Sequence, residues 1–238
     1  NGHRTNVAGV IAAVGNNKIG TAGLLWNAKI MPLKALDKTG FGNEDKLGEA
    51  IRYAVDNGAK IVVMSLGLHR YSPYLHDIVE YAERNGVLLV AAAGNEGNNV
   101  KYPAAYPTVL AVGGIGLSKS IIQESNFGPE IDLVAAWEVY TTALGGGYKS
   151  NYGTSMAAPQ VAAVAAMVWS KYRDWEPAQV RNMLRQTAED ISLRGWDERT
   201  GYGIVRADRA LSATYSRDLY EPNNNLANAA RIPIEHTL

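Results

Sequence analysis

Three separated segments of the chain carry side chains that together could perform acyl transfer, and the most informative of them surrounds Ser155. This serine lies between small residues in Gly-Thr-Ser-Met-Ala-Ala-Pro, and the alanine-rich stretch 161–167 follows it. The pattern predicts a hydroxyl at the start of a buried helix, where the partial positive charge of the helix stabilises developing anions. Ser155 is therefore a candidate nucleophile, and the ordinary alternative is a serine that caps its helix.

Two further segments supply the other groups that this chemistry needs. His3 stands in Asn-Gly-His-Arg-Thr-Asn-Val-Ala-Gly, and Asn95 follows an apolar run in Ala-Ala-Ala-Gly-Asn-Glu-Gly. A neutral imidazole can take the serine proton, and a carboxamide can donate to an oxyanion. Taken singly, His3 could be an exposed terminal histidine and Asn95 an asparagine in a turn. Together with Ser155 they predict a general base and an oxyanion donor.

At these three segments the sequence resembles the subtilisin-like serine peptidases, particularly the thermitase-like branch. The family motifs read His-Gly-Thr-His-Val-Ala-Gly, Ala-Ala-Gly-Asn and Gly-Thr-Ser-Met-Ala-Ser-Pro, and their counterparts occur here in family order. The resemblance covers about residues 1–213. It implies a secreted, monomeric serine endopeptidase that hydrolyses peptide bonds in proteins through an acyl-enzyme. Its implied partners are a polypeptide substrate and its own propeptide, and the chemistry needs no cofactor.

The resemblance also implies a substrate cleft. A peptide bond can be presented to a fixed serine when its flanking backbone is held as an extended strand by edge hydrogen bonds. One side of this clamp would be formed by Ser65, Leu66 and Gly67, and the other by Gly40, Phe41 and Gly42. The primary pocket would be lined by Leu66, Ala92 and Gly94, with Glu96 near its base. We expect this pocket to be apolar and permissive.

Residues 14–21 resemble the calcium loop of the thermitase-like branch. Calcium binds several carbonyl and amide oxygens, which a turn with inward carbonyls supplies. The implied ligands of a structural calcium are the main-chain oxygens of Val14, Ile19 and Thr21 and the side-chain oxygen of Asn17. The family's carboxylate ligands come from segments upstream of residue 1. A plain asparagine-rich turn is the alternative, because these residues form turns without an ion.

Departures from the family pattern bear on activity. The family's catalytic aspartate lies upstream of the histidine and has no counterpart here, and its loss costs about 10⁴ in turnover in enzymes with this triad. We therefore expect an N-terminally truncated chain that is nearly inactive as it stands. Arg4 and Asn6 replace the family's Gly and His, while Ala158 and Gln160 replace its Ser and His. The second hypothesis is a catalytically inactive relative that binds peptides or proteins through the same groove.

An α/β-hydrolase esterase is disfavoured, because Ser155 lies in Gly-Thr-Ser-Met-Ala and not in Gly-x-Ser-x-Gly. The alternation of apolar runs with helical periodicity predicts an α/β fold, with a three-layer, mostly parallel twisted sheet and helices on both faces. In such sheets active residues gather at the carboxyl ends of strands, where Asn95 would lie. The expected strands are 30–33, 61–65, 87–93, 109–113 and a pair within 131–144; the expected helices are 7–14, 47–55, 75–82, the segment that Ser155 opens and the segment after Pro177.

Composition limits the remaining functions. The chain has 238 residues, of which 47% are hydrophobic, so it can bury the core of one sizeable domain. We predict a peptidase domain at residues 1–213 and a polar linker or tail at 214–238. Lys plus Arg and Asp plus Glu both number 23, which gives no overall field to attract nucleic acid. The sequence contains no run of about eighteen apolar residues, which is the length that a membrane-spanning helix needs. Cysteine is absent, so thiolate metal sites and disulfides are excluded.

Overall fold

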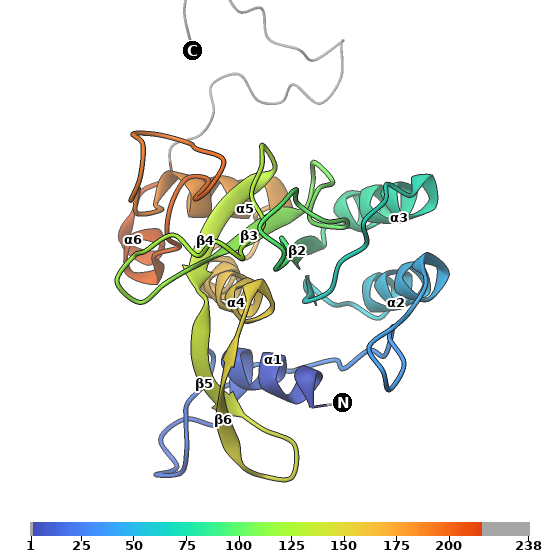
Figure 1. Cartoon of the computed structure of the whole chain (residues 1–238), viewed down its shortest axis with the longest axis horizontal. Coiled ribbons are helices and arrows are strands. Elements are labelled where there is room, and N and C mark those ends of the chain that lie inside the picture. Colours follow the sequence, from blue (N-terminus) through green and yellow to red (C-terminus); the bar gives the residue numbers. More distant parts are fainter. Residues whose placement is uncertain (1, 216–238) are drawn as a thin grey trace, which may run out of the picture.

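The computed structural model describes residues 2–215, and a parallel sheet forms its centre (Figure 1). The sheet has four strands in the order β1-β2-β3-β4. Val63 of β1 pairs with Val90 of β2, and Ala91 pairs with Ala111 of β3. The expected strands at 61–65, 87–93 and 109–113 are confirmed, and the fourth is the first half of the expected pair. The bounds are β1 Ile61–Met64, β2 Leu88–Ala92, β3 Leu110–Ile115 and β4 Ile131–Ala136.

Helices cover both faces of this sheet, as Figure 1 shows. Successive residues of a strand point to opposite faces, so Leu89 packs with the helices α2 and α3 while Leu88 and Val90 pack with α4, α5 and α6. The three-layer α/β architecture predicted from the sequence is confirmed. The helix bounds are α2 Glu44–Asp56, α3 Pro73–Arg84, α4 Thr154–Lys171, α5 Pro177–Gln186 and α6 Ala207–Ser212.

The helix α4 lies directly against the sheet because its buried side chains are small. Ala157, Ala158 and Ala165 are fully buried, and α4 contacts all four strands. Small side chains let a helix backbone approach its neighbour closely, and this contact places the start of α4 at a defined position over the sheet. The position of Ser155 is therefore set by the packing of the whole helix.

The remaining helix and two strands pack next to α4, outside the central sheet. Helix α1 (His3–Ala12) packs against α4 and β5. Strands β5 (Glu138–Thr142) and β6 (Tyr148–Tyr152) form an antiparallel hairpin, and β6 leads directly into α4. This arrangement brings the amino-terminal segment and the hairpin to the same end of α4 that carries Ser155.

The expected strand at 30–33 is wrong, because residues 27–35 form neither helix nor strand. A strand is stable only when its backbone groups pair with a neighbour, and Pro32 has no N–H to contribute. Ile30 and Met31 are exposed, so they do not have the burial expected of a core strand. The predicted tail at 214–238 lies outside the described residues from position 216 onward. Between residues 2 and 215, no helix combines the length and the apolar character required to cross a membrane.

Candidate active site

Ser155 is the second residue of α4, and the backbone turn before it depends on glycine. The N-cap is Gly153, whose φ of 116° lies in a region that favours glycine. Its N–H donates to the carbonyl of Trp137 at 3.0 Å, and a Cβ at this position would lie 3.0 Å from Asn95 Nδ2. No side-chain hydrogen bond caps this helix. The interpretation of Ser155 as a capping serine is therefore wrong.

A proline inside α4 explains how the serine is tied to the sheet. Pro159 has no N–H, so it cannot donate to the carbonyl of Ser155 four residues earlier. Ser65, which follows β1, donates its hydroxyl to that carbonyl at 2.8 Å. In return, Ser155 Oγ lies 3.5 Å from the carbonyl oxygen of Ser65, which is a long contact. The serine hydroxyl is thus held near the carboxyl end of β1 and is only weakly engaged.

Asn95 follows β2 and is oriented by Thr154, the neighbour of the serine. Its Oδ1 accepts from the backbone N–H of Thr154 at 2.9 Å and from Thr154 Oγ1 at 2.7 Å. The same hydroxyl accepts from the N–H of Gly94 at 3.2 Å. Among residues 2–215, neither the Asn95 amide nitrogen nor the N–H of Ser155 has a hydrogen-bond partner. Two donors are therefore left free beside the serine.

His3 is the first residue of α1, which packs against α4, and it is half-buried. Burial lowers the pKa of its imidazole, and the nearby cation of Lys149 lowers it further. This environment favours the neutral form that a general base requires. In the described part of the chain, His3 forms no hydrogen bond with Ser155 or Asn95. In structures without substrate, catalytic hydrogen bonds are often long or poorly aligned.

The residues that depart from the family pattern beside His3 are accommodated by the fold. Arg4 is exposed, so it does not enter the packing around His3. Asn6 is buried, donating to the carbonyl of Thr142 at 2.7 Å and accepting from Asn151 Nδ2 at 3.1 Å. The amide therefore anchors α1 to the β5–β6 hairpin. Gln160 also has its amide satisfied, because it donates to the carbonyl of Ala136 at 2.8 Å.

The loop that contains one predicted side of the substrate clamp is shaped by Asp37. Its carboxylate accepts from the N–H of Thr39 at 2.8 Å and of Phe41 at 3.0 Å, and its own N–H donates to the Phe41 carbonyl at 2.7 Å. The Thr39 hydroxyl bond and these backbone bonds hold the pKa of Asp37 below its usual range. The N–H of Gly40 donates to the Asp37 carbonyl at 3.3 Å, so it closes the same turn, and Gly40 adopts a φ of 91°. Among the residues that the structure describes, the backbone N–H and carbonyl of Gly42 form no hydrogen bond.

The other predicted side of the clamp, residues 65–67, leads into a pair of backbone hydrogen bonds. Leu68 exchanges two backbone hydrogen bonds with Tyr102, at 2.7 and 3.0 Å. The neighbouring Gly67 is exposed, and within residues 2–215 its N–H and carbonyl have no partner. Leu66 is half-buried at this position. Free backbone groups on Gly67 are what an added peptide strand would need.

The residues predicted for the primary pocket lie around the end of β2. Ala92 is buried on the strand, Gly94 follows with φ 116°, and Glu96 is exposed beyond it. Glu96 forms an ion pair with Lys101 and lies 3.9 Å from His69 Nε2. The hydrogen bond from Lys101 is the main reason that the pKa of Glu96 is lowered. Lys101 belongs to none of the recognised motifs, so the sequence alone carries no signal for its place here.

The loop predicted to bind calcium forms a tight asparagine turn. Asn17 Oδ1 accepts from the N–H of Ile19 at 3.0 Å, and Asn16 and Lys18 adopt φ of 57° and 62°. Val14, Asn17 and Ile19 are exposed. No group of three or more His, Cys, Asp or Glu that could hold a metal occurs in the described part of the chain. The donors available are neutral carbonyl and amide oxygens, which suit calcium but provide no charge.

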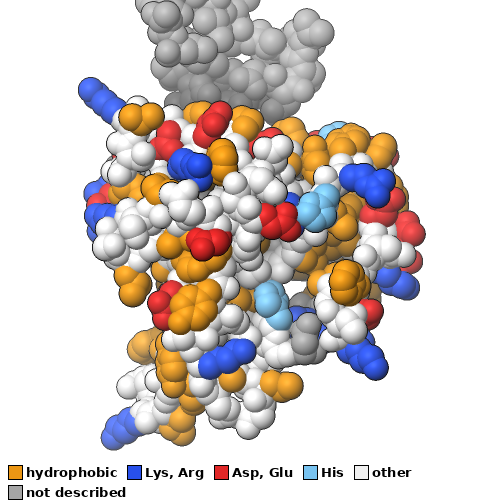
Figure 2. Space-filling model, in the orientation of Figure 1, with side chains coloured by type: hydrophobic (Ala, Val, Ile, Leu, Met, Phe, Trp, Pro, Cys, Tyr) orange, Lys and Arg blue, Asp and Glu red, His pale blue; other side chains and the backbone are white. Residues whose placement is uncertain are grey.

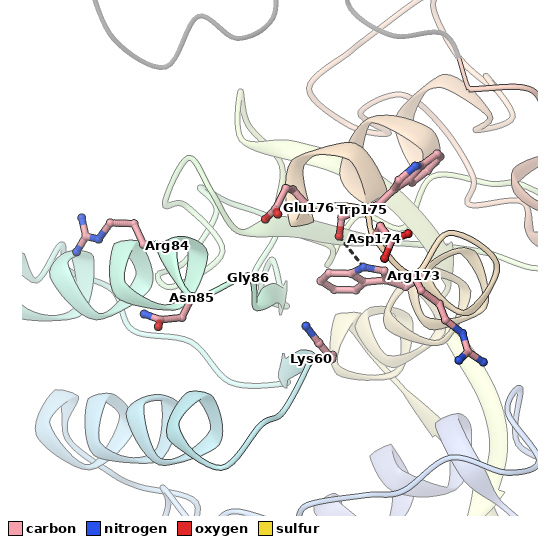
Figure 3. A pocket seen from close by; sticks show the side chains of 9 residues that line it. Lys60, Arg84, Asn85, Gly86, Arg173, Asp174, Trp175 and Glu176 are labelled. Carbon is pink, nitrogen blue, oxygen red and sulfur yellow. Dashed lines mark hydrogen bonds between the residues drawn. The ribbon is translucent and has the colours of Figure 1, made fainter.

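Figure 2 shows a histidine side chain on the surface between the α1–hairpin region and the rest of the molecule, with hydrophobic side chains exposed over the hairpin. A pocket of about 430 Å³ lies at the amino ends of the strands, at the opposite edge of the sheet from Ser155 and Asn95 (Figure 3). It is lined by Lys60 before β1, Gly86 before β2 and residues after α4 such as Trp175. Because the serine and Asn95 lie at the carboxyl ends of the strands, this pocket is separate from the candidate site.

A serine at the start of a buried helix, an adjacent asparagine amide with a free nitrogen and a histidine on the packed neighbouring helix are the residue types that a serine-hydrolase site requires. The profile of the subtilase family matches residues 1–203. The chain belongs to this family.

Named relatives agree with this assignment. Alkaline elastase YaB from Bacillus sp. (strain YaB) is 40% identical over 212 residues, covering 88% of this chain and 55% of that protein. Subtilisin E from Bacillus subtilis (strain 168) is 41% identical over 192 residues, covering 78% of this chain and 50% of that protein. The chain thus spans about half the length of the curated relatives it matches.

A solved structure supports the fold independently. Fervidolysin from Fervidobacterium pennivorans, described as a keratinolytic enzyme related to subtilisin, superposes with a TM-score of 0.83 at 32% identity. The match covers 90% of this chain and 36% of fervidolysin. The parallel sheet and its covering helices are therefore the subtilisin-like arrangement expected from the sequence.

Proposed function

We propose that this protein is a serine endopeptidase that cleaves polypeptides through an acyl-enzyme. The observation that carries the proposal is the fixed Asn95 amide, which Thr154 holds beside Ser155 with its nitrogen free. A donor oriented in this way can stabilise the negative charge that develops on a reacting carbonyl oxygen. The subtilase membership of the chain supports the same chemistry.

In the proposed reaction, Ser155 Oγ attacks the substrate carbonyl carbon and His3 accepts the hydroxyl proton. The resulting oxyanion receives hydrogen bonds from Asn95 Nδ2 and from the backbone N–H of Ser155, which is one of the unpaired donors of a helix start. His3 then gives its proton to the leaving amine as the peptide bond breaks. Water repeats the sequence against the acyl-enzyme, with His3 as base, and releases the acid product.

The substrate would lie as an extended strand between two backbone edges. Within residues 2–215, Gly67 offers free backbone groups on one side and Gly42 on the other, whereas the Gly40 N–H is bonded to the Asp37 carbonyl. Main-chain hydrogen bonds recognise any sequence, so they favour a general polypeptide substrate. Discrimination between side chains must then come from the pocket around Leu66, Ala92, Gly94 and Glu96.

Further properties rest on the family resemblance. We propose that the protein is secreted and monomeric, that its own propeptide is a second partner, and that a structural calcium binds the carbonyls of Val14, Ile19 and Thr21 with Asn17 Oδ1. The donor types of this loop support the calcium site, because they are the neutral carbonyl and amide oxygens that calcium accepts. The formal net charge of zero supports the expectation that nucleic acid is not a partner.

A fluorophosphonate probe applied to the complete gene product tests the proposal, because such probes react with activated serines. We expect covalent labelling that maps to Ser155, loss of labelling in a Ser155→Ala variant, and hydrolysis of an unfolded protein substrate. A folded, unlabelled protein that binds peptides without turnover would instead establish the inactive, peptide-binding relative.

A further inference from the structure

Lys101 lies between Gly94, which lines the proposed primary pocket, and Gly67 of the adjoining clamp. Its backbone N–H donates to the carbonyl of Ala93 at 2.9 Å, which brings residue 101 back alongside the end of β2. Its Cβ and Cδ lie 2.9 Å from the point that a Cβ on Gly67 would occupy. Its Cδ also lies 3.2 Å from the corresponding point on Gly94. The aliphatic stem of the lysine therefore lies between these two glycines, beside the Asn126 amide, whose Nδ2 lies closer still to the same point on Gly94.

The ammonium group of Lys101 is also fixed in position, by an ion pair. The side chain is 14% exposed, and Nζ pairs with Glu96 Oε1. Asn98 Nδ2 lies 3.5 Å from the other carboxylate oxygen of Glu96, which orients the acid from the far side. A lysine that buries its methylene groups and pairs its charge leaves little room for a second side chain.

We propose that Lys101 is the specificity-determining residue of this cleft, restricting the primary pocket to small, uncharged side chains such as those of glycine, alanine and serine. The inference rests on the proposed endopeptidase function. It departs from the apolar and permissive pocket expected from the sequence. Large aromatic side chains would have to displace the stem between Gly67 and Gly94. An acidic side chain would approach an ammonium group that is already neutralised, and it would be repelled by Glu96.

The experiment compares cleavage after alanine and after phenylalanine in otherwise identical peptides, using the complete gene product. Wild type should prefer alanine. Lys101→Ala removes the stem and should raise the phenylalanine-to-alanine ratio of kcat/KM by about tenfold or more, the scale of discrimination by pocket volume. Lys101→Met keeps most of the stem without the charge and should retain the wild-type preference. Lys119→Ala, which removes a surface lysine paired with Glu189, is the matched control.

Fluorophosphonate labelling of Ser155 in each variant separates the two hypotheses. Labelled enzyme with the same ratio in wild type and Lys101→Ala would overturn the inference and leave the endopeptidase intact. Absence of labelling and turnover would refute the endopeptidase instead. The pocket is then tested by calorimetry with N-acylated peptides that end in alanine or phenylalanine: Lys101→Ala should selectively strengthen binding of the phenylalanine peptide, and an unchanged selectivity would overturn the inference.

Discussion

Replacing Thr154 by valine tests whether the asparagine donor is held in place by its neighbour. Thr154 is fully buried, and its hydroxyl both donates to Asn95 Oδ1 at 2.7 Å and accepts from the N–H of Gly94 at 3.2 Å. Valine has nearly the same shape but has no hydroxyl. The variant therefore removes one of the two bonds that orient Asn95 and leaves the Gly94 N–H unsatisfied.

The magnitude follows from these two losses. An unsatisfied buried donor costs about 1–3 kcal/mol of stability. Complete loss of an oxyanion donor lowers kcat by about 10²–10³, the value known for the equivalent donor in a subtilisin. Because the bond from the Thr154 N–H to Asn95 remains at 2.9 Å, we expect a smaller effect. Losing one net hydrogen bond of about 1 kcal/mol corresponds to a fall in kcat of about fivefold.

Steady-state kinetics on a peptide substrate and urea unfolding measure both effects. KM should change little, because the oxyanion forms only on the way through the transition state. Thr154→Ser restores the hydroxyl and should recover kcat. In an Asn95→Ala background, Thr154→Val should cause no further loss of kcat, because the group that it positions is gone. An equal loss of kcat in both backgrounds would refute the positioning role of Thr154.

Three other perturbations follow from the structure. Lys149→Gln removes a cation that lowers the pKa of His3, so the acidic limb of the kcat/KM profile should move to higher pH; an unmoved limb would show that the base does not sense this charge. The lowered pKa also means that the stability contributed by neutral His3 is fully present above its unfolded pKa of 6.5 and is lost as the pH falls through the folded value. In Glu83→Gln, the guanidinium of Arg181, which is only 9% exposed, keeps its bond to the Thr108 carbonyl but loses its carboxylate partner. The free energy of unfolding should fall by about 3 kcal/mol, and Glu83→Leu combined with Arg181→Met should largely recover it. A fall below about 1 kcal/mol would contradict a buried ion pair that matters for stability. Adding calcium should raise the Tm of this chain but not that of the Asn17→Ala variant. A wild-type Tm that does not change with calcium would exclude the predicted site.

The sheet and its main helices could be predicted because their signals are local. Residues 61–64 and 88–92 are short apolar runs, and α2 and α3 carry apolar side chains at helical spacing with Asn43 and Ser72 as caps. The 30–33 segment has a similar composition but no strand forms there. Composition reports that a segment can pair, whereas pairing itself depends on a neighbour elsewhere in the chain.

The candidate site divides in the same way. Ser155 and Asn95 could be predicted because each lies in a short motif that follows directly from, or leads into, a regular element. The bonds that orient them could not, because Thr154 and Asn95 are far apart in sequence and meet only when α4 packs on the sheet. The role of Asn6 was hidden for the same reason, since its partners Thr142 and Asn151 belong to the distant hairpin.

Lys101 illustrates the consequence for specificity. The family resemblance assigns Gly94 to the primary pocket and Gly67 to the adjoining clamp, and two neighbouring glycines without side chains suggest an open cavity. Space left by glycine is available to the substrate only if no other residue enters it. The loop after Asn95 returns to Ala93 and places a lysine there. The catalytic groups of a cleft can thus be inferred from motifs, whereas its selectivity depends on which distant side chain occupies the space between them.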